Sequence, residues 1–447
     1  MKISYNWLKQ YVDIDISAEK VAELLTFGGL EVEDVEVVET IKGGLKNYVV
    51  GHVLTCEMHP NSDHLHITTV DVGLEQPLNI VCGAPNVAAG QKVIVAKVGA
   101  KVYTSDDECF EIKRSKLRGE LSEGMICSEK ELCLSDNNDG IMVLDENAVV
   151  GTPAKEYFNI QEDYVFEIGL TANRSDATSH LGVGRDLVAL LKAQLNEEKQ
   201  LRLPSVDDFK TDSVENNDID IKIDTNLCKR YSAVTISGVK VMDSPQWLAD
   251  RLRVIGIRPI NNIVDATNFV LMETGQPLHA FDLKKIKSRK VVVKSQSAGM
   301  KFVTLDGIER ELNGKEAMVC DNDEPMCMGG IYGGLDSGVS TETTGVLLES
   351  AYFDPVVIRK AAKAHGLHTD ASFRYERGAD PNITLYALKR AALLIKEIAG
   401  GAISSEIKDV YPSTIEPVRI DLRYSYMDSL IGKSIERLLV KNILTSL

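Results

Sequence analysis

The sequence has no long apolar run and no paired cysteine motif. None of its apolar stretches approaches the roughly 18 residues that a membrane-spanning helix needs, and the opening Met-Lys-Ile-Ser-Tyr-Asn-Trp lacks the apolar core of a signal peptide. The eight cysteines are scattered without a CxxC pair, which is more typical of reduced thiols in a cytosolic protein than of a disulfide framework. We therefore expect a soluble, cytoplasmic protein.

Common catalytic motifs are also missing. The sequence contains no GxxxxGK[ST] motif, so a phosphate-binding loop of that kind is poorly supported. It contains no Ser-His-Asp or Cys-His motif that would suggest a covalent route, and Cys320 and Cys327 are interpreted as core thiols.

The length and the charge bound the answer further. At roughly 100 to 200 residues per domain, 447 residues predict about three domains. A composition of 44% hydrophobic and 26% charged residues disfavours collagen-like, disordered and coiled-coil classes. The formal net charge of −16 argues against an indiscriminate nucleic-acid binder.

The negative charge is unevenly distributed. Residues 1–40 have a net charge of −6 and residues 207–224 a net charge of −5, whereas residues 225–405 carry 23 basic and 20 acidic residues. Residues 92–118 hold seven basic residues against the four acids Asp106, Asp107, Glu108 and Glu111. The overall acidity therefore does not oppose nucleic-acid binding at these places.

Periodicity predicts a mixed α+β protein of several domains. Residues 1–40 form an opening piece with a helix that Ser17 caps and Gly28-Gly29 ends. Short β-type runs separated by turn residues then predict a small closed barrel. These runs are Val49–Leu54, Leu65–Val72, Leu78–Cys82 and Val93–Ala96.

The second half mixes helix and strand patterns. A helix is expected over 181–195, a solvated linker over 196–224, and an α+β domain over 225–405. Its expected strands are 231–239, 290–294 and 346–348, and its expected helices are 246–254 and 385–398. An amphipathic helix over 431–447 runs to the last residue, so we expect a domain to be cut short there.

The segment from Cys56 to His66 allows three interpretations. Cys56, His59, His64 and His66 are possible zinc ligands, but no second ligand pair at knuckle-type spacing accompanies them. The simpler interpretation is a turn at 60–63 followed by a strand with His64, His66 and Thr68 on its polar face.

The third interpretation uses more of the sequence. Gly51-His-Val, His59-Pro-Asn-Ser-Asp63, Val70-Asp-Val-Gly73, Ile80-Val-Cys-Gly-Ala-Pro-Asn-Val87, Gly90-Gln-Lys-Val93, Gly119-Glu, Ser122-Glu-Gly-Met125 and Cys127-Ser128 follow one another in order. Together they resemble the accessory tRNA-binding oligonucleotide-binding (OB) fold of synthetase-associated proteins. The resemblance implies tRNA contacts by basic residues, although a solvated barrel face explains any single one equally well. These residues are Lys92, Lys97, Lys101, Lys113, Arg114, Lys116 and Arg118.

A second resemblance rests on two motifs within the first 33 residues and on a third at residues 173–176. Ser4-Tyr-Asn-Trp-Leu8, Gly28-Gly29-Leu-Glu-Val32-Glu and Asn173-Arg174-Ser-Asp176 look like the N-terminal part of the bacterial phenylalanine–tRNA ligase β subunit. Ser175 departs from the family's usual Asn-Arg-Pro-Asp. We interpret Arg174 and Asp176 as a local ion pair at a helix entrance rather than as a partner-facing pair.

The region 258–380 is similar to the editing domain of the same subunit. We interpret its first part, Arg258-Pro-Ile-Asn-Asn-Ile-Val-Asp265-Ala-Thr267-Asn268-Phe-Val and Gly275-Gln-Pro277-Leu-His279-Ala-Phe-Asp282, as polar and turn-rich. Met328-Gly-Gly330, Gly333-Gly334, Glu349-Ser-Ala351, Phe353-Asp-Pro355 and Thr369-Asp-Ala-Ser-Phe-Arg374-Tyr-Glu376-Arg377-Gly-Ala-Asp380 follow. A lone His or Glu is usually structural or solvated, but glycine pairs let the backbone approach a bound group closely.

The resemblance implies roles for nine residues of this region. Glu349 would accept the phenol hydroxyl of a wrongly attached tyrosine, and His279, with Thr267 and Asn268, would hold the amino acid or the terminal adenosine and position a water. Arg258, Pro277, Gly329, Gly330 and Ala351 would complete the pocket.

The resemblance also implies a larger assembly. The family attaches phenylalanine to its tRNA with ATP and Mg²⁺ as an α2β2 heterotetramer, with the aminoacylation site in the α subunit and no metal site in this part of β. The implied domains are 1–40 completed by 152–200, an OB domain at 41–151, a B3/B4-type editing domain at 205–405 and the start of a helical B5-type domain at 407–447. The rival hypothesis is a non-catalytic tRNA-binding or assembly module.

Overall fold

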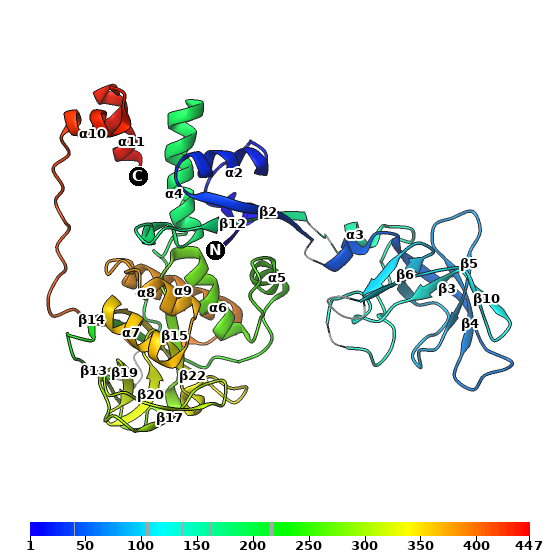
Figure 1. Cartoon of the computed structure of the whole chain (residues 1–447). Helices are drawn as coiled ribbons and strands as arrows, with labels where there is room; N and C mark the ends of the chain where they lie inside the picture. Colours follow the sequence, from blue (N-terminus) through cyan, green and yellow to red (C-terminus); the bar gives the residue numbers. More distant parts are fainter. Residues whose placement is uncertain (40, 104–107, 136, 159, 161, 214–218) are drawn as a thin grey trace. The chain divides into compact units, whose positions relative to one another are not determined.

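The computed structural model describes residues 1–39, 41–103, 108–135, 137–158, 160, 162–213 and 219–447. Asp106, Asp107 and residues 214–218, which entered the charge counts above, lie outside these ranges. The chain is a mixed α+β protein that divides into two compact units (Figure 1). Val37–Asp163 form one unit, which is inserted between the two stretches of the other, Met1–Glu36 and Tyr164–Leu447.

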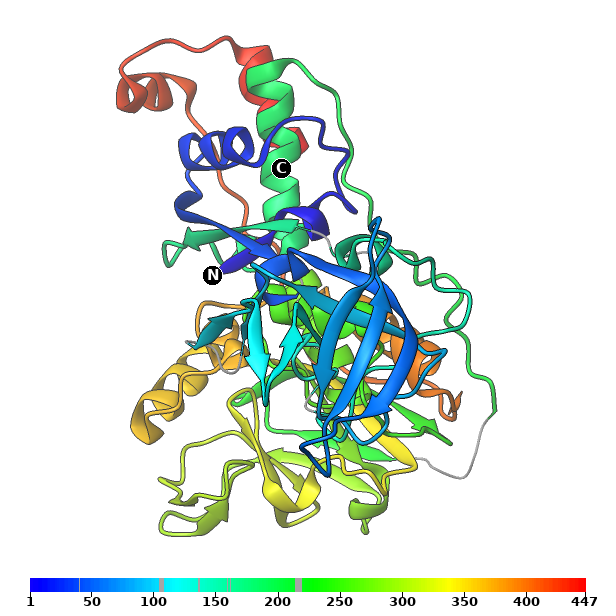
Figure 2. The same ribbon diagram turned by 90° about the vertical axis from the view of Figure 1, so that its right-hand side faces the viewer.

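The inserted unit is built on a curled antiparallel sheet (Figure 2). Its strands, in the order β11-β6-β3-β4-β5, are Gly124–Ile126, Lys92–Lys97, Tyr48–Met58, His66–Asp71 and Leu78–Cys82. The Val81 N–H donates to Ser122 Oγ (3.2 Å) and the Glu123 N–H to Asn79 O (2.8 Å), which links the two edge regions of the sheet. The sheet is therefore a nearly closed barrel, and the four predicted strand runs are confirmed.

One predicted side-chain direction in the barrel is wrong. Thr68 was expected on a polar face, but it is fully buried and donates to Ile80 O at 2.8 Å. It lies on the same face of β4 as Val70, which belongs to the apolar core. The unit also contains a 3-10 helix (Lys42–Leu45), β7 (Lys101–Tyr103), β8 (Cys109–Glu111), β9 (Ser115–Leu117), β10 (Glu120–Ser122) and α3 (Ala154–Tyr157).

The opening residues pack within the other unit. A three-stranded sheet in the order β1-β12-β2 joins Lys2–Ser4, Glu162–Gly169 and Glu31–Glu39. Ser17 caps α2 (Ala18–Phe27) by accepting from the Lys20 N–H, and Gly28 ends it, as predicted. The other helices here are α1 (Tyr5–Leu8) and α4 (His180–Leu190), which one π-helical turn extends to Leu195.

The rest of this unit has two five-stranded sheets. One contains β15 (Leu278–Asp282), β22 (Gly345–Phe353), β14 (Cys228–Ser237), β23 (Ala402–Ile403) and β24 (Lys408–Val410). The other contains β13 (Asp220–Ile223), β16 (Lys290–Lys294), β19 (Met318–Asp321), β20 (Glu324–Met328) and β21 (Tyr332–Gly333). A continuous apolar core joins residues of both sheets. The strands predicted at 231–239, 290–294 and 346–348 are confirmed, whereas β13 lies inside the predicted linker.

Helices and short strands complete the unit. They are α5 (Gln246–Val254), α6 (Asn262–Thr274), α7 (Pro355–His365), α8 (Asp370–Tyr375), α9 (Thr384–Ala399), α10 (Tyr424–Ile431), α11 (Arg437–Ser446), β17 (Lys301–Val303) and β18 (Glu309–Glu311). The predictions of α5 and α9 are confirmed. Within the described ranges, no helix combines the length and the apolarity that crossing a membrane requires.

Two predictions are wrong about where helices lie. The run predicted as turn-rich contains the 13-residue helix α6, which starts where Asn261 Oδ1 accepts from the Ile263 and Val264 N–H groups and ends at Gly275 in the left-handed conformation. Near the C-terminus, Gly432 ends α10, and α11 begins only at Arg437, so the predicted single helix over 431–447 is interrupted.

Candidate functional sites

Two neighbouring strands bring His279 and Glu349 face to face. β15 and β22 are antiparallel, and His279 on β15 lies directly opposite Glu349 on β22. Both line a cavity of about 70 Å³ together with Pro277 and Gly330. Four of the residues predicted for the editing pocket therefore surround one space. The rest of its lining is Leu278, Cys327, Ile331, Tyr332, Gly333, Ala371 and Tyr375.

The Glu349 carboxyl is buried and already accepts a hydrogen bond from the phenol of a tyrosine of the same chain. Its side chain is held at 4% exposure, and Oε2 accepts a hydrogen bond of 2.5 Å from the hydroxyl of Tyr231. Burial raises the pKa of Glu349 to about 7, and the bond from Tyr231 opposes this shift because it favours the carboxylate. Tyr231 lies on β14, opposite Ala351 of β22. Sequence reasoning missed Tyr231, because strand pairing alone brings it to Glu349.

His279 is neutral at physiological pH. Burial lowers the pKa of its imidazole to about 4. The ring packs edge-on against Phe281, and Nε2 has no hydrogen-bond partner among the described residues. A Cβ on Gly333 would lie 3.0 Å from His279 Cε1, so the small residue leaves room for the ring. A neutral imidazole at a cavity wall can exchange one hydrogen bond with a water or a substrate.

Two other predicted pocket residues, Gly329 and Ala351, lie close to the cavity but do not line it. Gly329 donates its N–H to Ala317 O (2.7 Å), and an added Cβ there would meet Phe353 at 2.7 Å. The Ala351 carbonyl accepts from Gln276 Nε2 (2.8 Å) and from the Tyr375 hydroxyl (2.9 Å). Neither Gly329 nor Ala351 lines the cavity.

Three predicted residues lie apart from the cavity lining. Thr267 and Asn268 sit on α6, where Thr267 Oγ1 donates to Val264 O of its own helix (2.7 Å). Arg258 is exposed in the segment before that helix. The structure therefore assembles His279, Glu349, Pro277 and Gly330, and leaves Arg258, Thr267 and Asn268 outside this cavity.

The cysteines of this region are buried, as expected for core thiols. Cys320 and Cys327 are both free and buried, and burial raises the pKa of each thiol. Cys327 also lines the cavity, but with a raised pKa it remains a protonated, weakly nucleophilic thiol.

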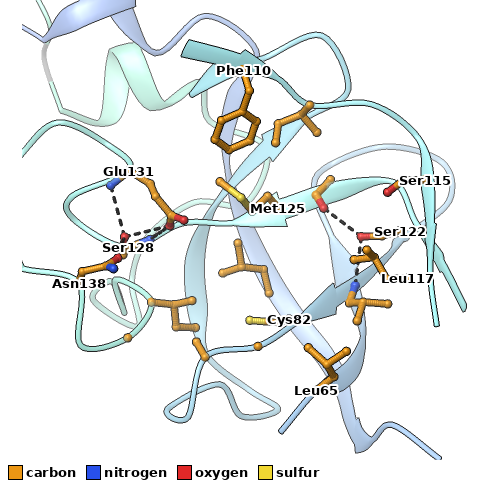
Figure 3. A pocket seen from close by; sticks show the side chains of 18 of the residues that line it. Leu65, Cys82, Phe110, Ser115, Leu117, Ser122, Met125, Ser128, Glu131 and Asn138 are labelled. Carbon is orange, nitrogen blue, oxygen red and sulfur yellow. Dashed lines mark hydrogen bonds between the residues drawn. The ribbon is translucent and has the colours of Figure 1, made fainter. Parts of the chain in front are cut away.

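The inserted unit contains a much larger cavity, of about 670 Å³ (Figure 3). Apolar side chains and one polar cluster line it. Of the predicted tRNA-binding residues, Lys113 belongs to the lining. Lys101, Arg114, Lys116 and Arg118 are exposed and Lys92 and Lys97 are half-buried. Arg114 pairs with Glu123 at 2.8 Å, and Arg118 Nη1 donates to Asn61 O at 2.7 Å.

The His-rich turn and the Arg174 motif have local roles. His59 is buried, and its Nδ1 accepts from the Asn61 N–H at 3.0 Å, which fixes the turn. In the described part of the chain, no group of three or more His, Cys, Asp or Glu side chains is arranged to hold a metal ion. Arg174 donates to both carboxyl oxygens of Asp176 (3.1 and 2.9 Å) and to Asp186 (2.5 Å), so the predicted local ion pair is confirmed.

Each of the two units contains a stretch that matches the model of a known domain family. Residues 48–153 match the model described as "Putative tRNA binding domain", and residues 227–400 match the "B3/4 domain". Among solved structures, an N-terminal fragment of the phenylalanyl-tRNA synthetase β-subunit from Pyrococcus horikoshii aligns with 64% of this chain and 77% of that chain. The TM-score of this alignment is 0.30 and the sequence identity is 15%.

Curated relatives match the chain along its length. The phenylalanine–tRNA ligase β subunit of Bacteroides fragilis (strain YCH46) is 56% identical over 450 residues, which is 100% of this chain and 54% of the relative. The same subunit of Porphyromonas gingivalis is 53% identical (100% and 54%), and that of Halalkalibacterium halodurans 44% (97% and 53%). The chain spans about half the length of these relatives, and it belongs to the family of phenylalanine–tRNA ligase β subunits.

Proposed function

We propose that this chain supplies tRNA binding and hydrolytic editing of tyrosyl-tRNA to a phenylalanine–tRNA ligase. In the proposed arrangement the inserted unit is an OB-fold that binds tRNA, with the basic residues between Lys92 and Arg118 along the phosphates. The B3/4 region removes tyrosine that was attached in error. The observation that carries the proposal is the His279–Glu349 pair across β15 and β22, at one small cavity.

The wider assembly is proposed from the relatives. They are named as β subunits, which implies an α partner, and we propose an α2β2 enzyme that uses ATP and Mg²⁺ with its aminoacylation site in the α subunit. The proposed domains of this chain remain 1–40 with 152–200, 41–151, 205–405 and the start of a further helical domain at 407–447. We further propose that the enzyme acts in the cytoplasm.

The need for editing follows from the chemistry of the two amino acids. An apolar pocket for phenylalanine rejects tyrosine weakly, because an added hydroxyl is worth only about a hundredfold in comparable cases. A second site that requires the hydroxyl can reject the phenylalanine ester by about ten-thousandfold, because its buried polar group would otherwise stay unpaired. Glu349 is such a group, since it is buried and Tyr231 bonds to only one of its oxygens.

The dimensions of the cavity support a proposed position for each part of the substrate. A space of about 70 Å³ is well below the roughly 300 to 1,000 Å³ of most ligand pockets, so it suits the hydroxyl end of the tyrosyl ring. The ester and the terminal adenosine then lie outside it, where Arg258, Thr267 and Asn268 of the neighbouring segment would act. Hydrolysis at such a site depends on orienting a water and stabilising the oxyanion, and neutral His279 is proposed to orient that water.

Deacylation of tRNA tests the proposal. Purified chain is mixed with tyrosyl-tRNA or phenylalanyl-tRNA, and the loss of the ester is followed with Glu349→Ala and His279→Ala beside the wild type. We expect hydrolysis of tyrosyl-tRNA only, reduced about a hundredfold or more in both variants. Glu342→Ala and His368→Ala, two exposed positions of the same unit, serve as matched controls.

The possible outcomes separate the site from the function. Wild-type hydrolysis that neither variant reduces would remove the site assignment but leave editing in place. Absence of hydrolysis by the wild type, both alone and in the α2β2 assembly, would instead favour the non-catalytic tRNA-binding or assembly module.

A further inference from the structure

The cavity of the inserted unit has one apolar and one polar side. Phe110, Met125 and Leu117 line it with large apolar groups, and Figure 3 shows Ser128, Glu131 and Asn138 together at another wall. Phe110 is 45% exposed and Leu117 42% exposed, although both are large apolar side chains. Exposed apolar groups around a cavity indicate a surface that binds another molecule.

The charges inside the cavity exclude a phosphate group as the preferred occupant. Glu111, Glu131 and Asp139 line the cavity against the single lysine Lys113. A doubly charged phosphate among three carboxylates would be repelled. Outside the lining, Lys116 and Arg118 are exposed on the adjoining segment and can meet a phosphate backbone that passes the mouth.

The polar wall offers a donor and an acceptor. Ser128 Oγ lies 2.9 Å from Glu131 Oε2 and 3.0 Å from Asn138 Oδ1, and the Ser128 N–H donates to the same Glu131 oxygen at 2.7 Å. The Ser128 N–H therefore fixes Glu131, while the single Ser128 hydroxyl proton can be donated to only one of the two neighbouring oxygens at a time. Within the described residues, Glu131 Oε1 and the Asn138 amide N–H₂ have no protein partner, so an acceptor and a donor are available beside each other.

We propose that this cavity takes one unpaired nucleobase of an RNA strand, with a preference for bases that carry an amino group. The ring would stack against Phe110 and Met125, as bases do on aromatic side chains in single-strand binders. Its amino group would donate to Glu131, and a ring acceptor would receive the Asn138 amide. The volume of about 670 Å³ accommodates one nucleoside, within the usual range for ligand pockets.

The proposal predicts which pyrimidine binds better. Cytosine presents an amino donor beside a ring acceptor, which matches Glu131 and Asn138. Uracil presents a carbonyl oxygen in place of the amino group, and this oxygen would face the Glu131 carboxylate. The inference rests on the proposed tRNA binding and adds the part of the RNA that enters the barrel.

Binding of two matched oligonucleotides tests it. Fluorescein-labelled C10 and U10 RNA are titrated with the full chain, and Kd is read from fluorescence anisotropy. We expect C10 to bind about fivefold to tenfold tighter than U10, within the range that one good base-edge pairing supplies. Glu131→Gln should bring this ratio close to one, because an amide can satisfy either base.

The stacking partner is tested separately. Phe110→Ala should weaken both oligonucleotides by roughly fivefold to a hundredfold, the usual value of one base–aromatic stack. Val98→Ala removes an equally exposed apolar side chain of the same unit that does not line the cavity, and it should change neither Kd. The far-ultraviolet circular dichroism of each variant verifies that the barrel is folded.

The results distinguish this inference from the proposed function. If the wild type binds tRNA in a salt-dependent manner, but C10 and U10 bind equally and Phe110→Ala has no effect, the base pocket is wrong and tRNA binding stands. If the wild type binds neither tRNA nor oligonucleotide, both fail. A loss in Phe110→Ala that is equal for an abasic strand would also overturn the base pocket, because no base would be involved.

Discussion

The two cavities of this chain differ in almost every physical property. The one in the inserted unit has a volume of about 670 Å³ and exposed lining residues such as Phe110. The one beside His279 has a volume of about 70 Å³ and a wall formed by the buried carboxyl of Glu349. The first can adapt to a flexible strand, whereas the second can admit or reject a single hydroxyl group.

The difference extends to the charges. At the barrel five of the seven predicted basic side chains are exposed and two are half-buried, so each exposed one contributes a small energy that salt screens. At the small cavity Glu349 is buried and His279 is half-buried, and burial moves the pKa of Glu349 up to about 7 and that of His279 down to about 4. We therefore expect changes at the barrel to be graded and salt-dependent, and changes at the small cavity to be large and pH-dependent.

The largest effect is expected from Gly330→Ala. Gly330 has a φ of +69°, and an added Cβ would lie 2.8 Å from Tyr375 Cδ2 and 3.0 Å from Ile358 Cδ1. The substitution combines left-handed strain with a steric clash, and we expect it to lower the free energy of unfolding by about 3 kcal/mol. It should also abolish hydrolysis of tyrosyl-tRNA, because the cavity has little room to lose.

Gly366→Ala is the matched control for that prediction. Gly366 has a φ of +63°, yet an added Cβ would meet no atom within 4 Å. It should therefore cost only the strain, about 1 kcal/mol, and leave hydrolysis intact. Urea denaturation measures both variants. Equal losses of stability would show that the cavity is not tightly packed around Gly330.

The second-largest effect is expected from Tyr231→Phe, which should shift the pH profile of tyrosyl-tRNA hydrolysis. The Tyr231 hydroxyl stabilises the Glu349 carboxylate, so its removal should raise the pKa of Glu349 further. A hydrogen bond to a charged group is worth about 1.5 to 3 kcal/mol, which corresponds to roughly one to two pH units. The acid limb of tyrosyl-tRNA hydrolysis should move to higher pH by that amount. Tyr332→Phe, which changes another tyrosine of the same cavity, should leave the midpoint in place.

The Glu349 carboxyl also predicts the direction in which the free energy of unfolding changes with pH. The folded-state pKa of Glu349, about 7, lies above its ordinary value of 4.5, so the folded protein binds an extra proton between these two pH values. The wild type should therefore lose stability relative to Glu349→Gln as the pH rises from 4.5 to 7. Urea denaturation at several pH values measures this difference, and a gain for the wild type over that window would contradict the buried carboxyl.

Sequence patterns predicted the elements better than the site. The barrel strands and α2, α5 and α9 were predictable because their apolar periodicity and end signals are local. Helix α6 was not, because Asn261, Asp265 and Asn268 give its sequence a polar character. The structure explains part of this: Asp265 is buried and accepts from Ser244 Oγ (2.6 Å) and from the Ile260 N–H (2.9 Å).

The composition of the small cavity depended on tertiary pairing. His279 and Glu349 are 70 positions apart in the sequence, and only the register of β15 against β22 places them opposite each other. The family resemblance supplied both residues, but no local pattern could indicate that Tyr231 would occupy one oxygen of Glu349. Side chains that reach a site from a third strand are the part of a site that sequence periodicity cannot predict.

The smallest effect is expected from single basic residues of the barrel, with Lys116→Ala as the example. Lys116 is exposed, so its ammonium is available to a phosphate, whereas Arg114 is already paired with Glu123 at 2.8 Å. Removing one phosphate contact should lower the slope of log K against log salt for tRNA by about 0.7 to 0.9. Arg114→Ala should lower the slope less, because Glu123 already neutralises part of its charge.

Salt titrations of tRNA binding measure both slopes, and the deacylation rate at saturating tRNA is the second readout. Lys116→Ala should leave that rate unchanged, because in the proposed function the lysine helps to bind the RNA and takes no part in the hydrolysis. If Arg114→Ala changes the slope as much as Lys116→Ala, the Glu123 pair is broken when RNA binds. If Lys116→Ala lowers the saturated rate, the contrast between a barrel surface with graded effects and a small cavity with all-or-none effects does not hold, because binding at the barrel would then control the chemistry at the cavity.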